Sequence, residues 1–170
     1  PEGWSWCRLL TPVALNPKNA VDDETLASFL PMAAIEEGFR NKYHSEVRRW
    51  KEIKNSFTQF ADGDVVFAKI SPCFENGKYF IASDLKNGVG AGTTELYVLR
   101  PSSEELDNRY LFYFLVSNYF MRDAKKTLMG SVGQQRIKKE YLEKMLLPIP
   151  PLAEQRRIVK RIEEVFNLVG

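Results

Sequence analysis

Three prolines near the C-terminal end, in the stretch LPIPPLAEQRRIV at residues 147–159, restrict the local backbone more than any other feature of the sequence. Each proline fixes its own φ, lacks a backbone donor and disfavours helical geometry at the preceding residue. Residues 147–150 are therefore predicted to be extended, and a helix can begin only at about Pro151. Proline suits the first helical position, because the N–H group there has no partner inside the helix. The sequence thus predicts an extended segment that continues directly into a helix.

The predicted helix carries a narrow apolar stripe among charged residues. The stripe residues recur at steps of four, three and four: Ile158, Ile162, Val165 and Val169. Such a seam is typical of a helix that packs against a partner helix. It covers fewer than the three or four heptads that a coiled-coil prediction needs, so we expect the helix to continue in a longer protein. A helix that packs back on its own domain fits the same periodicity equally well.

The composition predicts one folded domain in a reducing compartment. The chain has 170 residues, of which 44% are hydrophobic and 12% aromatic, which is enough for a sizeable core. It has no run of eighteen apolar residues, and its first residues, PEGWSWCRLL, lack the pattern of a signal peptide. Cys7 and Cys73 are far apart and have no metal-ligand spacing, which favours free thiols. We therefore expect a cytoplasmic protein without a membrane span.

Strand and turn signals dominate the first hundred residues. Pro31 makes residues 25–35 an edge or irregular strand, and residues 36–61 form a long loop with one helical turn near 46–53. The apolar run at 64–70 predicts a buried strand, and Asn76-Gly77 predicts a tight hairpin turn before a returning strand at 78–82. A further strand is expected at 93–99.

The remaining residues predict helices around a glycine-containing loop. Helices are expected at 107–117, 118–128 and 138–144, with the loop at 129–135 between the last two. The fold class is therefore α+β: a twisted, mainly antiparallel sheet with hairpins and flanking helices, which ends in the start of a long amphipathic helix. Residues 1–149 form the globular domain, and residues 150–170 form the beginning of that helix.

Three patterns that suggest catalysis do not fit the context that such chemistry needs. The glycines of NGVGAG at 87–92 precede a predicted strand instead of a helix, so they predict a turn and not a nucleotide loop. Glu52 and Lys54, with Asp22 and Asp23 upstream, resemble the acidic residues and lysine of a metal-dependent nuclease site, but their polar and basic flanks favour surface charge. His44 is the only histidine, which excludes a two-histidine metal site and disfavours a serine-histidine-aspartate triad. We therefore expect a binding module and no enzyme, with no cofactor or metal in this chain.

Basic charge is concentrated in two segments. Residues 1–119 carry 13 Lys/Arg against 16 Asp/Glu, whereas residues 120–170 carry 11 against 6. Cations, hydroxyls and amides suit phosphates and base edges, so both segments are candidates for DNA contacts. The alternative for either cluster alone is a solvated charged face, and Lys125 and Lys126 also suit a helix C-terminus. The candidates are Lys125, Lys126, Ser131, Gln134, Gln135, Arg136 and Lys138 in one segment, and Arg40, Lys42, Arg48 and Arg49 in the other.

Segments along nearly the whole chain resemble one target-recognition domain of a type I restriction-modification specificity subunit. The most specific are GDVVFAKI at 63–70 and PPLAEQRRIV at 150–159. Others are PEGWSWCRL, SFLPMAAI, GAGTTELYVLRP and GSVGQQRI, in the order of the family. The resemblance adds Lys69, Asn76 and Lys78 as candidate DNA contacts. Asn76 also suits a turn, and Lys69 could extend from a strand to solvent.

The resemblance implies a non-catalytic subunit that reads double-stranded DNA. In such subunits two recognition domains, separated by two long helices, each read half of a bipartite site. The implied partners are methyltransferase subunits, restriction or translocase subunits, and a second recognition domain or second copy that contacts the spacer helix. S-adenosylmethionine, ATP and magnesium would be held by these partners. Two alternatives stay open: a protein-interaction adaptor with a basic surface that does not bind DNA, and, less favoured, a nuclease.

Overall fold

A central sheet with both faces covered organises the chain. The computed structural model describes residues 1–131 and 134–169, and for Val169 only the backbone. The central sheet has the order β2 (Val13–Leu15), β9 (Leu96–Pro101), β6 (Val65–Ala68) and β7 (Tyr79–Ile81), with every pair antiparallel. Strand β6 lies inside the sheet, and all four of its residues are buried. The strand predicted at 64–70 is thereby confirmed.

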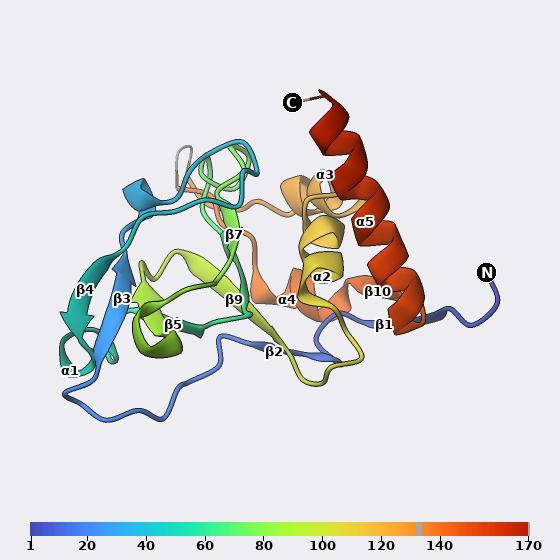
Figure 1. Cartoon of the computed structure of the whole chain (residues 1–170). Helices are drawn as coiled ribbons and strands as arrows, with labels where there is room; N and C mark the ends of the chain where they lie inside the picture. Colours follow the sequence, from blue (N-terminus) through green and yellow to red (C-terminus); the bar gives the residue numbers. More distant parts are fainter. Residues whose placement is uncertain (132–133, 170) are drawn as a thin grey trace.

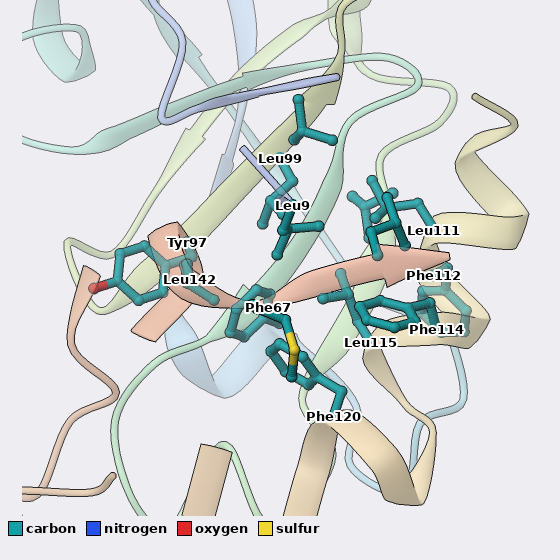
Figure 2. Packing of buried hydrophobic residues seen from close by; sticks show 14 of the residues in the cluster. Leu9, Phe67, Tyr97, Leu99, Leu111, Phe112, Phe114, Leu115, Phe120 and Leu142 are labelled. Atoms are coloured by element: carbon teal, nitrogen blue, oxygen red, sulfur yellow. The ribbon is translucent and has the colours of Figure 1, made fainter. Parts of the chain in front are cut away.

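The two faces of β6 serve two hydrophobic cores, because successive side chains of a strand point to opposite faces. Val65 and Phe67 face the helices, where Phe67 packs against Phe120 with ring centroids 6.0 Å apart. Figure 2 shows this core, with Leu111 and Leu115 on the helical side of the sheet. Val66 and Ala68 belong to a second core between the two sheets. A continuous apolar run is the expected sequence of a strand that is buried on both sides.

The second sheet lies on the far side of the central sheet from the helices (Figure 1). Its order is β4 (Glu46–Arg49), β3 (Leu26–Leu30), β8 (Val89–Gly92) and β5 (Thr58–Ala61). Strands β3 and β8 are parallel, and the other pairs are antiparallel. The short helix α1 (Trp50–Ile53) covers the outer face with the buried side chains of Trp50 and Ile53. The predicted α+β class with mainly antiparallel strands is confirmed.

Two predictions for residues 25–61 are wrong. Strand β3 has a neighbour on each side and is no edge strand. Pro31 does not disturb it, because the strand ends at Leu30 and Pro31 precedes the short 3-10 helix Met32–Ala34. The segment 36–61 is not one long loop, since it contains β4, α1 and β5. Their strand partners are distant in sequence, and a local pattern cannot predict such pairing.

The glycine predictions need two corrections. Asn76-Gly77 does not form a tight hairpin turn, because residues 69–78 form a longer connection between β6 and β7. Gly77 has φ +76°, and an added Cβ would lie 2.8 Å from the ring and backbone of Phe39. Gly90 and Gly92 lie inside strand β8 and not in a turn. A Cβ on Gly90 would lie 2.6 Å from the Phe60 ring, so the absence of a side chain allows close packing there.

The three predicted helices of the second half are confirmed. Helix α2 (Asn108–Leu115) begins after Asp107, whose carboxylate accepts hydrogen bonds from the N–H groups of Arg109 and Tyr110. Helix α3 (Asn118–Lys126) begins after Ser117, whose hydroxyl accepts from the Phe120 N–H. Side-chain caps of this kind satisfy backbone donors that a helix start leaves free. Helix α4 (Lys139–Lys144) follows, and a second 3-10 turn, Lys86–Gly88, precedes β8.

The proline junction is extended and then helical, as predicted. Strand β10 (Leu146–Ile149) pairs antiparallel with β1 (Ser5–Arg8), which places Trp6 opposite Pro148. Helix α5 (Leu152–Val169) follows directly after Pro151.

The fully buried Gln155 holds the start of α5 to the domain. Its amide donates to the carbonyls of Glu105 and Pro150, both at 2.9 Å, and its oxygen accepts from the Asp107 N–H. Val159 is buried one turn later, and α5 lies beside α2 (Figure 1). Among residues 1–131 and 134–169, no helix is long and apolar enough to cross a membrane.

Candidate nucleic-acid interface

Three loops from distant parts of the chain meet at one end of the domain. They are residues 36–44, residues 69–78, and residues 129–131 with 134–138, which we name the loop surface; they gather near the top of Figure 1. The N–H groups of Gly38 and Phe39 donate to the carbonyls of Asn76 and Gly77, at 2.7 and 2.9 Å. The Ser71 N–H donates to the Gln135 carbonyl at 2.8 Å. Backbone hydrogen bonds therefore join the first loop to the second, and the second to the third.

A hollow of about 410 Å³ on this surface gathers four cationic side chains. Lys69, Arg136, Lys138 and Lys139 line it together with Tyr97, Met129, Ile137 and Glu140. The Lys69 ammonium lies 5.2 Å from the centroid of the Tyr97 ring. Cations around an aromatic floor suit a polyanion such as the nucleic-acid backbone. Of these residues, Lys69, Arg136 and Lys138 were predicted as DNA contacts.

The floor of the hollow is fixed by Tyr97. Its hydroxyl donates to the Ile137 carbonyl at 2.9 Å, and Ile137 is itself buried. Burial raises the pKa of the Tyr97 hydroxyl, and the nearby carboxylates of Glu140 and Glu95 raise it further. The hydroxyl is therefore a stable donor at neutral pH and anchors the segment that follows Arg136.

Arg136 is bound to a carboxylate within the protein. Its Nε donates to Oε2 of Glu95 at 2.8 Å, and its Nη2 donates to Oε1 at 2.7 Å. Its Nη1 donates to the carbonyl of Gln134 at 2.9 Å. The hydrogen bond from Arg136 lowers the pKa of Glu95, so the carboxylate is charged at neutral pH. Such side-on pairs combine charge with fixed geometry.

Most of the remaining predicted residues on the loop surface are exposed. The Asn76 amide donates to the Glu37 carboxylate at 3.1 Å, and Arg40 lies 3.9 Å from Glu36. Arg40 also borders a separate pocket of about 570 Å³, which lies between loop 36–44 and helices α2 and α5. Lys42, Ser131 and Gln134 are exposed, and Gln135 is half-buried. Gly133, which the loop prediction included, lies outside the described residues.

Lys78 is removed from the candidate interface, although it lies in the same loop as Lys69. It is only 8% exposed, and its ammonium donates to the carbonyls of Met32 and Ile35 at 3.0 and 2.9 Å. Burial of an ammonium requires such partners, because an unpaired one is costly. Lys78 therefore ties the 69–78 loop to the beginning of the 36–44 loop.

The part of the second basic segment that lies on β4 and α1 is paired with carboxylates, most of them in the acidic segment that precedes β3. Glu24 pairs with Arg49 at 3.2 Å and with Lys51 at 2.5 Å, and Asp23 pairs with Lys54 at 2.5 Å. Arg48 pairs with Glu46 and lies 3.9 Å above the Phe29 ring. Arg48 and Arg49 thus belong to edge strand β4 and not to the loop surface.

Lys125 and Lys126 occupy the last turn of α3, where cations counter the helix dipole. Lys126 pairs with Asp123 at 3.0 Å. Both lysines are exposed, and the chain reaches loop 129–138 three residues later. Their position at the end of α3 agrees with the helix-dipole explanation. In sequence, they also lie just before the third loop of the loop surface.

Sequence reasoning missed two residues of the hollow. Tyr97 lines it, and Glu95 binds Arg136 of its lining. A signal for Glu95 exists, because a carboxylate at the start of the apolar run LYVL is unusual in a buried strand. Tyr97 gives no such signal, since an aromatic residue in a strand is ordinary.

The seam of α5 divides into a packed part and an exposed part. Ile158 and Ile162 line an apolar groove of about 250 Å³ with Trp6, Tyr110 and Tyr119 among its other residues. Beyond it, Val165, Phe166 and Leu168 are 44%, 58% and 83% exposed. The side chain of Val169 lies outside the described residues. The first half of the helix therefore packs on its own domain, and the second half presents apolar side chains to solvent.

The described residues contain no cluster of three or more histidine, cysteine or carboxylate side chains able to hold a metal ion. In the nuclease-like set, Lys54 is bound to Asp23, and Glu52 lies exposed on α1. Both residues are therefore ordinary charged residues of the protein surface.

The chain is similar to specificity proteins of type I restriction systems. Residues 16–169 match the family model described as the type I restriction modification DNA specificity domain. The chain is 43% identical over 169 residues to the type I restriction enzyme EcoAI specificity subunit and 44% identical over 169 residues to the EcoEI specificity subunit, both from Escherichia coli. These alignments cover 99% of this chain but only 29% and 28% of the relatives, so the chain spans less than a third of their length.

Solved structures share the fold. The crystal structure of the HsdS subunit from Thermoanaerobacter tengcongensis superposes with a TM-score of 0.76 at 22% identity, over 99% of this chain and 43% of that one. A chain from a study of complex assembly and conformational transition of the type I R-M system gives a TM-score of 0.68 at 20% identity, over 99% of this chain and 40% of that one.

Proposed function

Because this chain belongs to the family of type I restriction modification DNA specificity domains, we propose that it is one target-recognition domain that reads half of a bipartite DNA site. The observation that carries the proposal is the loop surface. Three sequence-distant loops meet there, and Lys69, Lys138 and Lys139 surround an aromatic floor. Lysines suit phosphates, while the exposed amide of Gln134 suits a base edge.

The loop surface is the more favourable of the two basic surfaces. The cations around β4 and α1 are paired with Asp23, Glu24 and Glu46, so little positive charge is left for DNA. On the loop surface, no ion pair is formed by Lys69 or Lys138 within the described part of the chain. A cation without an internal partner can bind a phosphate and release counterions without first losing an ion pair.

The proposal divides the chain at the proline junction. Residues 1–149 read DNA, and residues 150–170 begin the helix that separates two recognition domains. The exposed Val165, Phe166 and Leu168 support a partner helix beyond the groove. That helix belongs to a second recognition domain or to a second copy of the chain. The buried Gln155 supports a fixed angle between the domain and the helix, which a measuring element needs.

The complete protein would act without its own active site, in the cytoplasm. It would position methyltransferase subunits on the DNA and serve as the scaffold for restriction or translocase subunits. S-adenosylmethionine, ATP and magnesium would be bound by these partners and not by this chain.

The decisive experiment maps methylated motifs in a host with and without the complete gene set. The expected result is a bipartite motif that depends on the genes. Exchange of residues 1–149 for the matching segment of another specificity subunit should change one half of that motif and leave the other half intact. A motif that ignores this exchange would contradict the proposal. The alternative, a protein-interaction adaptor, predicts no binding of the complete complex to random duplex DNA even at low salt.

A further inference from the structure

Loop 129–138 is closed by hydrogen bonds that converge on one residue. The Arg136 N–H donates to the Met129 carbonyl at 3.0 Å, and the Met129 N–H donates back at 3.4 Å. The residues on either side of Arg136 are bonded to the second loop. The Gln135 carbonyl accepts from the Ser71 N–H, and the Ile137 N–H donates to the Lys69 carbonyl. The backbone around Arg136 is therefore held to the second loop. Among the described residues, Gln134 has two internal bonds: its N–H donates to the Ser131 carbonyl at 2.9 Å, and its carbonyl accepts from the Arg136 side chain.

The side chain of Arg136 is used inside the protein. Three of its five N–H groups are taken, two by the carboxylate of Glu95 and one by the carbonyl of Gln134. Glu95 is fixed in turn, because its carbonyl accepts from the Lys69 N–H at 2.8 Å and its N–H donates to the Thr93 hydroxyl at 3.2 Å. The Glu95 carboxylate thus holds the Arg136 guanidinium, which in turn holds the carbonyl of Gln134.

We propose that Glu95 and Arg136 form a positioning pair that fixes the backbone of Gln134 and so orients its amide toward a base, an inference that rests on the proposed function. Arg136 is then no direct reader of DNA. Recognition of a base edge by an amide requires two aligned hydrogen bonds, so a small shift of the loop tip costs discrimination. Glu95 determines specificity although it touches no DNA.

Charge alone predicts the opposite effect of removing Glu95. Its carboxylate cancels one positive charge on a surface that faces phosphates. Glu95→Gln therefore strengthens binding to every duplex if the pair is only a surface ion pair. If the pair positions the loop, the same change lowers affinity for the recognised motif while affinity for random DNA stays equal or rises. The two explanations are distinguished by whether Glu95→Gln raises or lowers the affinity for the recognised motif.

The test uses the complete specificity protein in complex with its methyltransferase subunits. The probes are a duplex with the methylated motif mapped from the host and a random duplex of equal length. For Glu95→Gln and for Arg136→Lys, we expect the ratio of motif affinity to random affinity to fall about tenfold, the effect of one lost charged hydrogen-bonded pair. The double variant should lose no more than either single variant, because both changes break one unit.

Arg100→Lys is the matched control. Arg100 lies near the other end of β9 and binds Asp64 with the same side-on geometry, at 2.7 and 2.8 Å. This variant should lower the thermal unfolding midpoint and leave the affinity ratio unchanged. Random-duplex affinity and the unfolding midpoint of each loop variant verify that it is folded.

The outcomes separate the inference from the proposed function. A ratio that is unchanged or higher in Glu95→Gln overturns the positioning pair while DNA recognition stands. Additive losses in the double variant overturn it as well, because Arg136 would then contact DNA itself. A wild-type complex that binds both duplexes equally refutes the proposed function, and this inference fails with it.

Discussion

Replacement of Lys138 and Lys139 by alanine in the complete complex should make DNA binding less dependent on salt. Lys138 is exposed at the N-cap of α4 and forms no ion pair within residues 1–131 and 134–169. The Lys139 ammonium lies 3.3 Å from the Glu143 carboxylate. This exposed ion pair contributes little to stability, so Lys139 can leave Glu143 and bind a phosphate. Both lysines line the hollow of the loop surface.

The size of the effect follows from counterion release. Each lost phosphate contact reduces the slope of log affinity against log salt by about 0.9. The double variant should therefore have a slope flatter by about 0.9 to 1.8, where the lower value applies if Lys139 stays with Glu143. Between about 50 and about 200 mM salt, wild-type affinity should fall about 3- to 12-fold more than that of the variant.

The assay is equilibrium binding to a random duplex at four or more salt concentrations. Lys51→Ala with Lys54→Ala is the matched control, because it removes the same formal charge from lysines already paired with Glu24 and Asp23. The control slope should equal the wild-type slope. If the control flattens the slope and Lys138→Ala with Lys139→Ala does not, the surface around α1 binds the phosphates and the assignment of the loop surface is wrong.

Three further perturbations test other parts of the structure. Gly90→Ala should destabilise the domain by about 1–3 kcal/mol in chemical denaturation, because the new Cβ would lie 2.6 Å from the Phe60 ring; an unchanged midpoint would contradict the packing of β8. Phe166→Ser with Leu168→Ser should reduce self-association of the 170-residue chain in sedimentation, since both side chains are exposed on α5; equal association in the variant would show that these two side chains are not responsible. Arg136 lowers the pKa of Glu95, so the stability that the pair contributes is fully present above the ordinary glutamate value of 4.5 and is lost as pH falls through the lowered value. The difference in unfolding free energy between wild type and Glu95→Gln should therefore disappear in acid, and a difference that grows in acid would refute this sign.

Features with a local cause could be predicted from the sequence. The proline junction formed as expected, because proline acts on its own φ and on the residue before it. Helices α2 and α3 also have a local cause, which the structure shows: each begins after a capping residue, Asp107 or Ser117. The family, too, could be identified from short segments such as GDVVFAKI.

Strand pairing across long separations could not be predicted. Strand β4 has only four residues, three of them exposed, and its regularity comes from hydrogen bonds with β3, some twenty residues earlier. The same holds for β8: its glycines predict a turn, but β8 is a strand because it pairs with β3 on one side and β5 on the other. Non-local pairing depends on which segments share a core, and a window of neighbouring residues does not contain that information.

The sequence by itself determined where the chain bends, which segments are apolar and which residues carry charge. Only the tertiary structure decided which charged side chains are buried, which are paired within the protein and which line the hollow. Lys69 and Lys78 lie in one loop, yet Lys78 is buried under two carbonyls and Lys69 lines the hollow. Arg136 and Lys138 are two residues apart, yet Glu95 holds only Arg136. The physical reason is that backbone geometry depends on adjacent residues, whereas the solvation and partner of a charge depend on distant segments that folding brings beside it.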